Sequence, residues 1–475
     1  QPIGEAFANG PLVGRDVVVD ASQILGGMER AGQGWKMLME SLAAGRSISL
    51  PALSIGAVQL AARVVGAYGT VREQFDTPIG RFEGVEELMA PIAGHAYFMT
   101  AARDLTCGAL DQGEHPAVIS AIMKAYLTQG MRECINHAMD IRAGAAIQRG
   151  PRNILARAYQ AVPIGITVEG SNVLTRSMII YGQGAIRCHP FIQDEIDAVA
   201  AGDLEKFDRS LFGHLNLIGR NAARAWILGL TGGRLASGHV NAFAAPYFRS
   251  LSRFSAAFAC ASEVAMLTLG GKLKRREKIS GRLADCLAWM YLASATLKRY
   301  ADEWQKDDDR ALVAWSCEYA LYRVQQALDG ICQNLDNRVA GRLLRWIVLP
   351  LGLRQRLPDD QLGSQAARTL LGDHDDRARL TADIFVPGPD EAGLGRLEEA
   401  LDRAVAAIHV ETKLRDAVRA GTLDRAPGLA LAENGLASGI INAEEFEILA
   451  DADDARSEAI QVDSFTPNQY RQLKG

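Results

Sequence analysis

The segment AVPIGITVEGSNVLT, residues 161–175, carries a single charged side chain, Glu169, in a run of apolar and small residues. Gly170 follows it directly, and the next two residues are a serine and an asparagine, which favour helix N-caps. Apolar residues then continue at helical spacing, so we expect a helix over residues 172–183 that begins just after Glu169. The segment therefore predicts a turn before a helix, with one carboxylate in the turn.

The surroundings of Glu169 favour its charged form in one respect and disfavour it in another. The positive end of the helix dipole stabilises an anion at this position, whereas apolar neighbours disfavour the charge by desolvation. A carboxylate held between these two effects is a candidate general base. Gly170 would let a ligand approach the backbone closely. The alternative is that Glu169 is simply an acidic residue beside a helix cap.

Outward from this turn, the sequence predicts a mainly α fold. Apolar residues recur at about every 3.6 positions and predict helices at 35–70, 85–112, 116–140, 152–160 and 172–183. Long helices with short connections of this kind indicate an antiparallel bundle. A second helical block is predicted at 194–206, 222–231, 249–269, 280–304, 308–334 and 338–347, with later helices at 396–419 and 443–460.

The first 30 residues differ from this pattern. Asp16-Val-Val-Val-Asp20 is a short β-branched run bounded by turn residues, which predicts one strand without a partner. We therefore expect residues 1–30 to be the remnant of a β domain, followed by a helical bundle over 31–192 and a second helical domain over 193–475. Since the chain begins at Gln1 rather than at methionine, we expect the rest of that β domain to lie outside it.

Composition excludes several classes of protein. The chain has 475 residues, of which 48% are hydrophobic, so a largely disordered chain is excluded. A net charge of −5 argues against nucleic acid as a partner. The seven cysteines form no CxxC pair and the eight histidines show no metal-ligand spacing, so we expect no disulfide scaffold and assign no metal. Scattered cysteines of this kind indicate a reducing compartment.

A second informative stretch is VREQFDTPIGRFEG, residues 71–84. Arg72 stands at the predicted end of a helix, just before a turn that contains Pro78 and Gly80. Its guanidinium could hold a phosphate at that turn. The alternative is that Arg72 hydrogen-bonds the last carbonyls of its own helix.

Taken together, these stretches resemble motifs of the acyl-CoA dehydrogenase family. Arg72, Phe75, Ile79 and Phe82 are similar to the family's Arg-x-x-Phe-Gly…Ile…Phe-Gln motif, and residues 169–172 to its Glu-Gly-Thr-x-Gln motif. Residues 143–146 resemble a Gly-Gly-x-Gly turn, and residues 31–36 with Arg46 resemble a Gly-x-Gly-Phe stretch and its substrate-contacting arginine. The resemblance is to the large bacterial fatty acyl-CoA dehydrogenases, which carry an additional C-terminal helical domain.

The resemblance implies an FAD-dependent enzyme of the first step of fatty-acid β-oxidation. Glu169 would remove the α-proton of a medium- or long-chain acyl-CoA, and hydride transfer from the β-carbon to the flavin would give trans-2-enoyl-CoA. The resemblance assigns Arg46 and Gly170 to the substrate, and it assigns to FAD the residues Arg72, Glu73, Gln74, Phe75, Gly144, Ser171 and Asn172. Residues 72–74 match positions that reach the FAD of a neighbouring subunit, so the resemblance also implies a homo-oligomer.

The expected partners and location follow from the same resemblance. Electron-transferring flavoprotein is the expected electron acceptor, whereas an acyl-CoA oxidase would pass the electrons to oxygen. A non-catalytic helical binding module, or an incomplete fragment of the enzyme, is a further alternative. The basic cluster at 270–278 and the apolar stretch with basic flanks at 342–356 would suit a membrane surface, with a solvated helix face and buried packing as the alternatives. We expect a cytoplasmic location, peripheral on the inner face of the plasma membrane.

Overall fold

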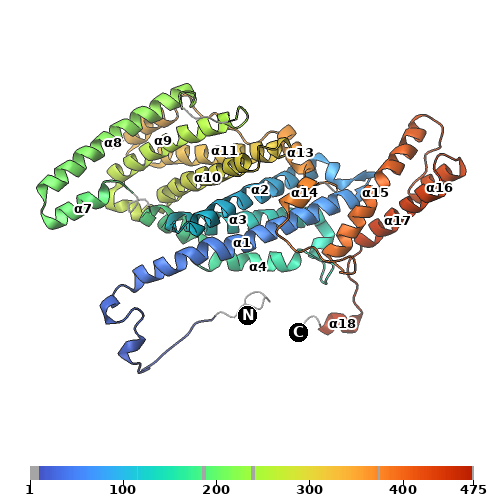
Figure 1. Ribbon diagram of the computed structural model, residues 1–475, viewed down its shortest axis with the longest axis horizontal. Coiled ribbons are helices and arrows are strands. Elements are labelled where there is room, and N and C mark those ends of the chain that lie inside the picture. Colours follow the sequence, from blue (N-terminus) through green and yellow to red (C-terminus); the bar gives the residue numbers. More distant parts are fainter. Residues whose placement is uncertain (1–9, 115, 185–188, 237–240, 373–374, 473–475) are drawn as a thin grey trace. The chain divides into compact units, whose positions relative to one another are not determined.

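The computed structural model describes residues 10–114, 116–184, 189–236, 241–372 and 375–472, and it is predominantly helical (Figure 1). The prediction of a mainly α fold is therefore confirmed. The strands among the described residues are β1 (Glu73–Gln74) and β2 (Thr77–Pro78), which form an antiparallel pair with Gln74 opposite Thr77. In the described part of the N-terminal segment, the stretch predicted as a strand, Asp16–Asp20, is not one, because no described segment pairs with it.

The helices follow one another along the chain with short connections. The first group comprises α1 (Gly34–Val71), α2 (Glu83–Asp111), α3 (Ala117–Arg142), α4 (Ala156–Thr167), α5 (Asn172–Leu174) and the π-helix η6 (Thr175–Gln183). The second comprises α7 (Ile192–Ala201), α8 (Leu204–Thr231), α9 (Ala245–Leu269), α10 (Glu277–Asp302), α11 (Arg310–Asn334) and α12 (Arg338–Val348). The third comprises α13 (Asp360–Arg368), α14 (Asp375–Leu380), α15 (Leu394–Arg419), α16 (Leu429–Ala437), α17 (Ala443–Ala459) and α18 (Pro467–Gln472).

Most predicted helices lie within a few residues of their positions, although α4 ends seven residues beyond the predicted end at 160 and helices α13, α14, α16 and α18 were not predicted. One boundary differs for a clear reason. The helix predicted over 194–206 is interrupted at Gly202, whose φ of 68° ends α7 in the left-handed conformation. Asp203 then begins α8, because its carboxylate accepts a hydrogen bond from the Lys206 amide at 2.9 Å. Helix α8 is consequently much longer than the helix predicted over 222–231.

The chain forms two compact units that do not follow its linear order. Unit one contains residues 1–55, 97–130 and 162–359, and unit two contains residues 56–96, 131–161 and 360–475. Each of α1 to α4 therefore contributes residues to both units. The domain boundaries expected from the sequence, at residues 30 and 192, stay a prediction.

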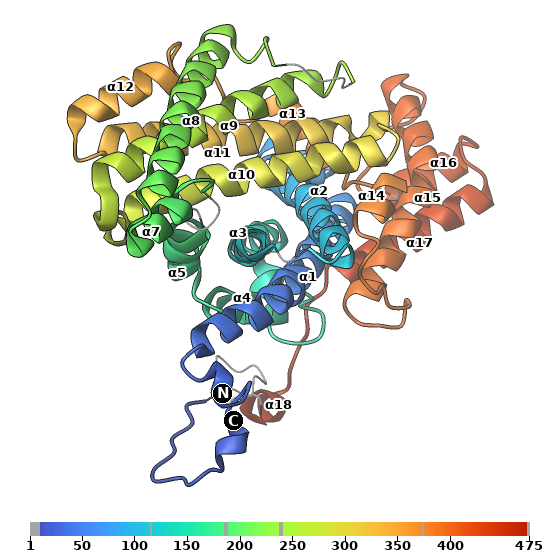
Figure 2. The same cartoon turned by 60° about the vertical axis from the view of Figure 1, so that its left-hand side comes forward.

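The core of unit one is built around α10 and α11, which lie side by side (Figure 2). Trp289 of α10 is its aromatic centre, with the rings of Phe98, Tyr126 and Tyr319 packed edge-on at centroid distances of 6.0, 5.8 and 5.3 Å. Edge-to-face pairs of this kind add to the free energy of burial. The paired helices thus supply a rigid support for the segments that pack on them, including η6.

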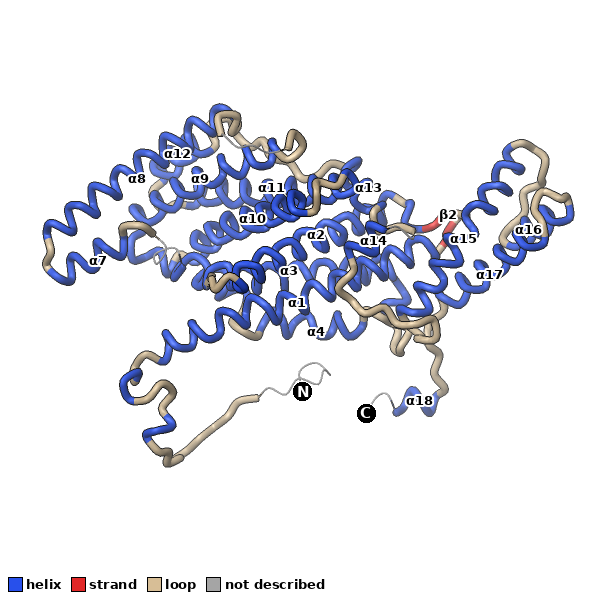
Figure 3. Tube along the Cα trace, in the orientation of Figure 1, coloured by secondary structure: helices blue, strands red, loops and turns tan. Residues whose placement is uncertain are grey.

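Unit two depends on a buried ion cluster as well as on apolar packing. Arg377 of α14 is 2% exposed and forms a two-pronged pair with Glu398 of α15, at 2.5 and 3.1 Å. Arg63 of α1 donates to the same carboxylate at 3.1 Å. Two guanidinium groups on one carboxylate compensate its desolvation and connect three helices. The short hairpin β1–β2 belongs to this unit (Figure 3).

Two segments are long and apolar enough to cross a membrane by length and composition alone. They are Gly45–Val71 and Ala245–Arg275, with mean hydropathy of 1.6 and 1.3. About half of each apolar window is buried within the chain, as in the core helices of globular proteins.

Two glycines of α1 provide a matched test of the packing in unit two. A Cβ at Gly66 would lie 2.0 Å from the Leu370 carbonyl oxygen, whereas a Cβ at Gly56 would meet nothing within 4 Å. We expect Gly66→Ala to lower the free energy of unfolding by about 1–3 kcal/mol through overpacking. We expect Gly56→Ala to raise it by about 0.5–1 kcal/mol through helix propensity. Urea denaturation of the two variants tests the packing, and equal effects would contradict it.

Candidate functional site

Glu169 lies in a sharp turn between α4 and α5 in unit one. Its φ is 55°, and the φ of Gly170 is 90°, so two consecutive residues are left-handed. The Val168 amide makes a bond of the helical type to the Ile164 carbonyl at 3.0 Å, and the Thr175 amide begins the next helix by donating to the Ser171 carbonyl at 2.9 Å. The predicted turn before a helix is therefore present, with Glu169 at its centre.

Gly170 is required by this turn itself. A positive φ is unfavourable for residues with a Cβ, and a Cβ here would lie 3.2 Å from the Thr175 hydroxyl oxygen. That hydroxyl donates to the Gly170 carbonyl at 3.1 Å. It also lies at the start of the π-helix η6, where the Ser177 hydroxyl donates to the Val173 carbonyl at 2.8 Å. These hydroxyl–carbonyl bonds compete with the α-helical pattern, and π-helices often occur beside functional sites.

A buried lysine of α3 donates hydrogen bonds to the residues on both sides of the turn. Lys124 of α3 is fully buried, and its ammonium donates to three oxygens. They are the Gly170 carbonyl at 2.7 Å, the Asn172 side-chain oxygen at 2.8 Å and the Ile166 carbonyl at 3.2 Å. An ammonium has three donors, so all of them are used. Lys124 thus connects the last turn of α4, the glycine turn and the first turn of α5.

The same burial changes the acidity of this lysine. Desolvation lowers the pKa of Lys124 to about 8, although the negative charge of Glu169 opposes the shift. The positive charge of Arg46 lowers the pKa of Lys124 further. Arg46 is only 6% exposed, and its Nε finds no hydrogen-bond partner among the described residues. Arg46, Lys124 and Glu169 therefore form one electrostatic group.

The carboxylate of Glu169 itself is exposed. The Ser49 hydroxyl of α1 donates to its Oε1 at 3.2 Å, and no described residue donates to its Oε2. Among nearby residues in the sequence, Val173 and Leu174 after the turn are 77% and 45% exposed, and Ile48 before Ser49 is 46% exposed, whereas Val168 and Ile166 before the turn are half-buried. The apolar run expected around Glu169 is therefore half-buried before the turn and exposed after it, while the carboxylate itself is exposed.

Ser171 and Asn172 differ in their orientation. Ser171 is the exposed N-cap residue of α5, and its side chain makes no capping hydrogen bond. The Asn172 amide instead donates to the Thr128 hydroxyl at 2.9 Å and the Ala125 carbonyl at 3.1 Å, and its oxygen accepts from the ammonium described above. Asn172 therefore fastens α5 to α3, and its side chain has little capacity left for a ligand.

The second group of predicted residues lies in unit two, at the β1–β2 hairpin. Arg72 directly follows α1, and its backbone is fixed by the Tyr68 carbonyl and the Ile79 amide, each at 2.8 Å. Gln74 is exposed, and Phe75 is 90% exposed with a positive φ of 54° at the tip of the hairpin. Arg72 is half-buried, and the exposed Gln74 uses one amide N–H to donate to the Glu73 carbonyl at 2.8 Å.

Glu73 is the inward-facing member of this hairpin. Burial raises the pKa of Glu73, and Arg456 of α17 opposes the shift from 3.7 Å. Arg456 also pairs with Glu411 of α15 at 2.7 Å. These residues line a groove of about 980 Å³ between the hairpin and α15–α17. Gly144, the remaining predicted residue, is exposed in the 3₁₀ helix η5 (Ala143–Ile147) of the same unit.

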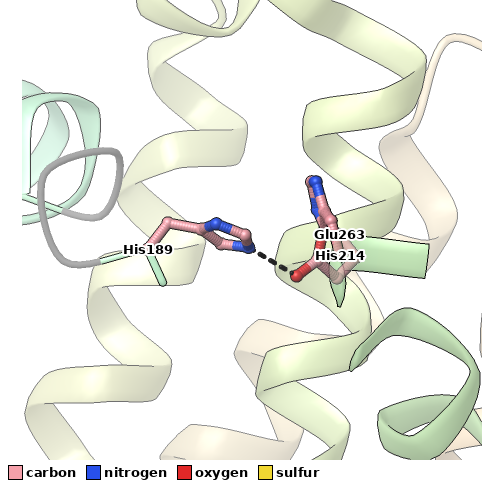
Figure 4. Close-up of side chains that lie close together, drawn as sticks. All are labelled: His189, His214 and Glu263. Atoms are coloured by element: carbon pink, nitrogen blue, oxygen red, sulfur yellow. Dashed lines mark hydrogen bonds and ion pairs between the residues drawn. The ribbon is translucent and has the colours of Figure 1, made fainter. Parts of the chain in front are cut away.

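A histidine–carboxylate cluster that the sequence did not indicate lies in unit one (Figure 4). Glu263 of α9 contacts His189 Nε2 at 2.9 Å and His214 Nε2 at 3.0 Å, and His214 Nδ1 contacts Glu195 at 2.8 Å. Burial by itself lowers the pKa of His214, but its hydrogen bonds to Glu263 and Glu195 outweigh burial and raise that pKa. His214 therefore favours the charged form that bridges α7, α8 and α9.

The hydrogen bonds of His189 decide between a metal site and an ion network. Its Nδ1 accepts the backbone amides of Phe191 at 3.2 Å and Ile192 at 3.1 Å, so the proton of the ring resides on Nε2. A metal would need the lone pair of that Nε2. We therefore interpret the cluster as an imidazole–carboxylate network, and the absence of a metal stays a prediction.

Comparison with known protein families identifies the class of protein to which this helical architecture belongs. The family described as "Acyl-CoA dehydrogenase, C-terminal, bacterial type" matches residues 186–465, and "Acyl-CoA dehydrogenase, C-terminal domain" matches residues 32–182. The chain belongs to the acyl-CoA dehydrogenase family. The resemblance inferred from the motifs is therefore confirmed.

Individual relatives agree with this assignment. Probable acyl-CoA dehydrogenase FadE10 of Mycobacterium bovis is 25% identical over 328 residues, which cover 65% of this chain and 49% of the relative, and the Mycobacterium tuberculosis protein gives the same values. The chain thus spans about half the length of these curated relatives. Its fold is similar to that of an acyl-CoA dehydrogenase complexed with FAD from Bacillus anthracis, with a TM-score of 0.53 and 14% identity over 69% of this chain and 56% of that one.

Sequence reasoning missed Lys124 and Ser49, which contact the predicted turn from α3 and α1. Lys124 did carry a signal, because it is the one charged residue in the apolar run AVISAIMKAYL, residues 117–127. A lone lysine on an apolar helix face is rarely buried without acceptors around it. Ser49 carried no comparable signal, since serines are common on exposed helix surfaces.

The acidity of Lys124 can be measured directly. In a chain labelled with ¹³C at lysine Cε, we expect one resonance to titrate near pH 8, because burial destabilises the ammonium. The shifted resonance should be absent from the Lys124→Met variant. A spectrum in which every lysine titrates near the ordinary value would contradict the buried ammonium.

Proposed function

We propose that the natural protein in which this chain occurs catalyses the α,β-dehydrogenation of a fatty acyl-CoA with FAD, giving a trans-2-enoyl-CoA. The observation that carries the proposal is the exposed carboxylate of Glu169 on a turn fixed by Lys124. Membership of the acyl-CoA dehydrogenase family supports it. The relatives named above are described as acyl-CoA dehydrogenases, and the Bacillus anthracis protein as complexed with FAD.

Glu169 is the base in this proposal. One carboxylate oxygen is oriented by the Ser49 hydroxyl, and the other remains available to accept the α-proton of a thioester. That proton is a very weak acid in water, so the base must be preorganised and the site must exclude water when substrate binds. Lys124 and Gly170 provide the preorganisation, because together they fix the backbone that carries the carboxylate.

The residues present also fit FAD, whose chemistry is to accept the hydride that leaves the β-carbon. The donors of Arg72 and Gln74 lie near the surface of unit two, and the ring of Phe75 is free to contact a flat group. A Cβ at Gly144 would meet nothing within 4 Å, so its backbone is open to approach. In unit one, Ser171 is exposed to hold the cofactor, whereas Asn172 is better assigned to positioning the turn.

Two features support a fatty acyl substrate of medium or long chain. Ile48, Val173 and Leu174 are exposed apolar side chains on α1 and α5, the helix that carries Ser49 and the helix that follows the Glu169 turn, and exposed apolar side chains suit an alkyl chain. Arg46 adds a positive charge to the electrostatic group of Lys124 and Glu169, which suits a polar group of an acyl-CoA. We further propose electron-transferring flavoprotein as electron acceptor, a homo-oligomeric assembly and a cytoplasmic location at the inner face of the membrane. Comparing that flavoprotein with oxygen as acceptor separates a dehydrogenase from an oxidase.

The base assignment is tested by Glu169→Gln. We expect kcat to fall by about 10²–10⁴-fold, because general-base catalysis is lost, while flavin absorbance and the melting temperature remain unchanged. Glu205→Gln, which changes an exposed carboxylate on α8, is the matched control and should keep full activity. Turnover that persists in Glu169→Gln would overturn the role of Glu169, and a colourless natural protein would overturn the flavoenzyme proposal.

A further inference from the structure

A pocket of about 340 Å³ in unit one is rich in arginine, and its lining contains none of the residues of the Glu169 turn. It is lined by Arg176 of η6, Arg282 and Asp285 of α10, and Tyr322 and Arg323 of α11. The lining thus holds three arginines and a single carboxylate. The position of each arginine is determined by neighbouring residues, and we consider the three in turn.

Arg176 is held against the backbone of α10. Asp285 forms a two-pronged pair with its guanidinium, with Nε at 2.6 Å from Oδ1, and the Tyr126 hydroxyl donates to the same carboxylate oxygen at 2.6 Å. Gly281 makes this approach feasible, since a Cβ there would lie 2.6 Å from the Nη1 atom of Arg176. The single carboxylate of the pocket is therefore already committed to Arg176.

Arg282 is accommodated by a glycine in the same way. A Cβ at Gly330 of α11 would lie 2.8 Å from Arg282 Nε, so the missing side chain makes room for the guanidinium. Arg282 donates to the Lys278 carbonyl at 3.3 Å. No carboxylate in the described part of the chain pairs with Arg282, so its charge is not neutralised.

Arg323 is ordered by aromatic rings. Its guanidinium carbon lies 5.2 Å from the centre of the Trp289 ring and 5.7 Å from that of Tyr319, and its Nη1 donates to the Tyr319 hydroxyl at 3.2 Å. Cation–π contacts orient an arginine without cancelling its charge. Within the described residues, no carboxylate pairs with Arg323 either.

The charge balance of the pocket is consequently positive. Three arginines and one aspartate leave two unneutralised positive charges among the residues that line it. Lys278 precedes Arg282 by one turn on α10, so the basic cluster at 270–278 leads directly into this helix. Positive charges held close together without a counter-ion repel one another, and an anion would relieve that repulsion.

We propose that this pocket binds a phosphate group. Guanidinium groups offer fork-shaped donors that match phosphate oxygens, and a phosphate monoester carries nearly two negative charges at neutral pH, which matches the surplus. The pocket volume of about 340 Å³ falls within the range for small-molecule sites, at its lower end. A volume of this size holds a phosphate group together with part of the molecule that bears it. That molecule is either a soluble phosphate ester or a lipid with a phosphate headgroup.

The test compares phosphate binding in the unmodified chain and in arginine variants. We expect inorganic phosphate to bind saturably in isothermal titration calorimetry, and coenzyme A and phosphatidylglycerol vesicles serve as the soluble and lipid probes. Arg282→Gln and Arg323→Gln should each weaken binding about tenfold or more, since each removes charge-assisted hydrogen bonds. Arg224→Gln, which changes an exposed arginine on α8, is the matched control and should leave binding unchanged.

A charge-preserving variant guards against effects of net charge alone. Gly330→Ala keeps every arginine but displaces Arg282, so it should weaken phosphate binding while the melting temperature stays close to that of the unmodified chain. Binding of coenzyme A that is tighter than that of inorganic phosphate and is weakened by Arg282→Gln and Arg323→Gln would indicate the soluble ester, whereas arginine-dependent binding to phosphatidylglycerol but not phosphatidylcholine vesicles would indicate the headgroup. The proposal would be overturned if phosphate did not bind saturably, or if Arg224→Gln weakened phosphate binding as much as the pocket variants do.

Discussion

The arrangement of the Glu169 site depends on one buried charge. An ammonium is costly to remove from water unless acceptors surround it, and Lys124 meets this requirement with the carbonyls of Ile166 and Gly170 and the amide oxygen of Asn172. These three acceptors come from the end of one helix, a turn and the start of the next helix. Satisfying one lysine therefore fixes the backbone on both sides of the carboxylate that we propose as the base.

The same physical solution recurs elsewhere in the chain. In unit two, the buried Arg377 is compensated by Glu398, and a neighbouring glycine of α1 allows the close backbone contact beside it. In the phosphate pocket, Gly281 and Gly330 let guanidinium groups lie on helix backbones. Glycines, which lack a side chain and so leave room for a neighbouring charged group, position charges in this protein as much as ion pairs do. A charge held in this way keeps its orientation when no ligand is bound, which reduces the free-energy cost of binding.

The sequence predicted the helices and the Glu169 turn because both are local properties. A period of 3.6 residues and an acid–glycine pair are visible within one short window. Lys124, which contacts the turn, precedes Glu169 by 45 positions in the sequence. Its contact depends on how α3 packs, which one sequence does not specify. For the same reason the inward orientation of Asn172 was not predictable. The strand expected at Asp16–Asp20 did not form because a strand needs a partner that local propensity does not supply.

The central claim is that Lys124 positions Glu169 for proton abstraction. The most direct measurement is the primary isotope effect on kcat with acyl-CoA deuterated at the α-carbon, in the natural protein and in its Lys124→Met variant. The account predicts that kcat falls, that KM changes little, and that the isotope effect increases, because proton abstraction becomes slower relative to the other steps. An unchanged kcat and isotope effect in a folded, flavin-containing variant would contradict the claim.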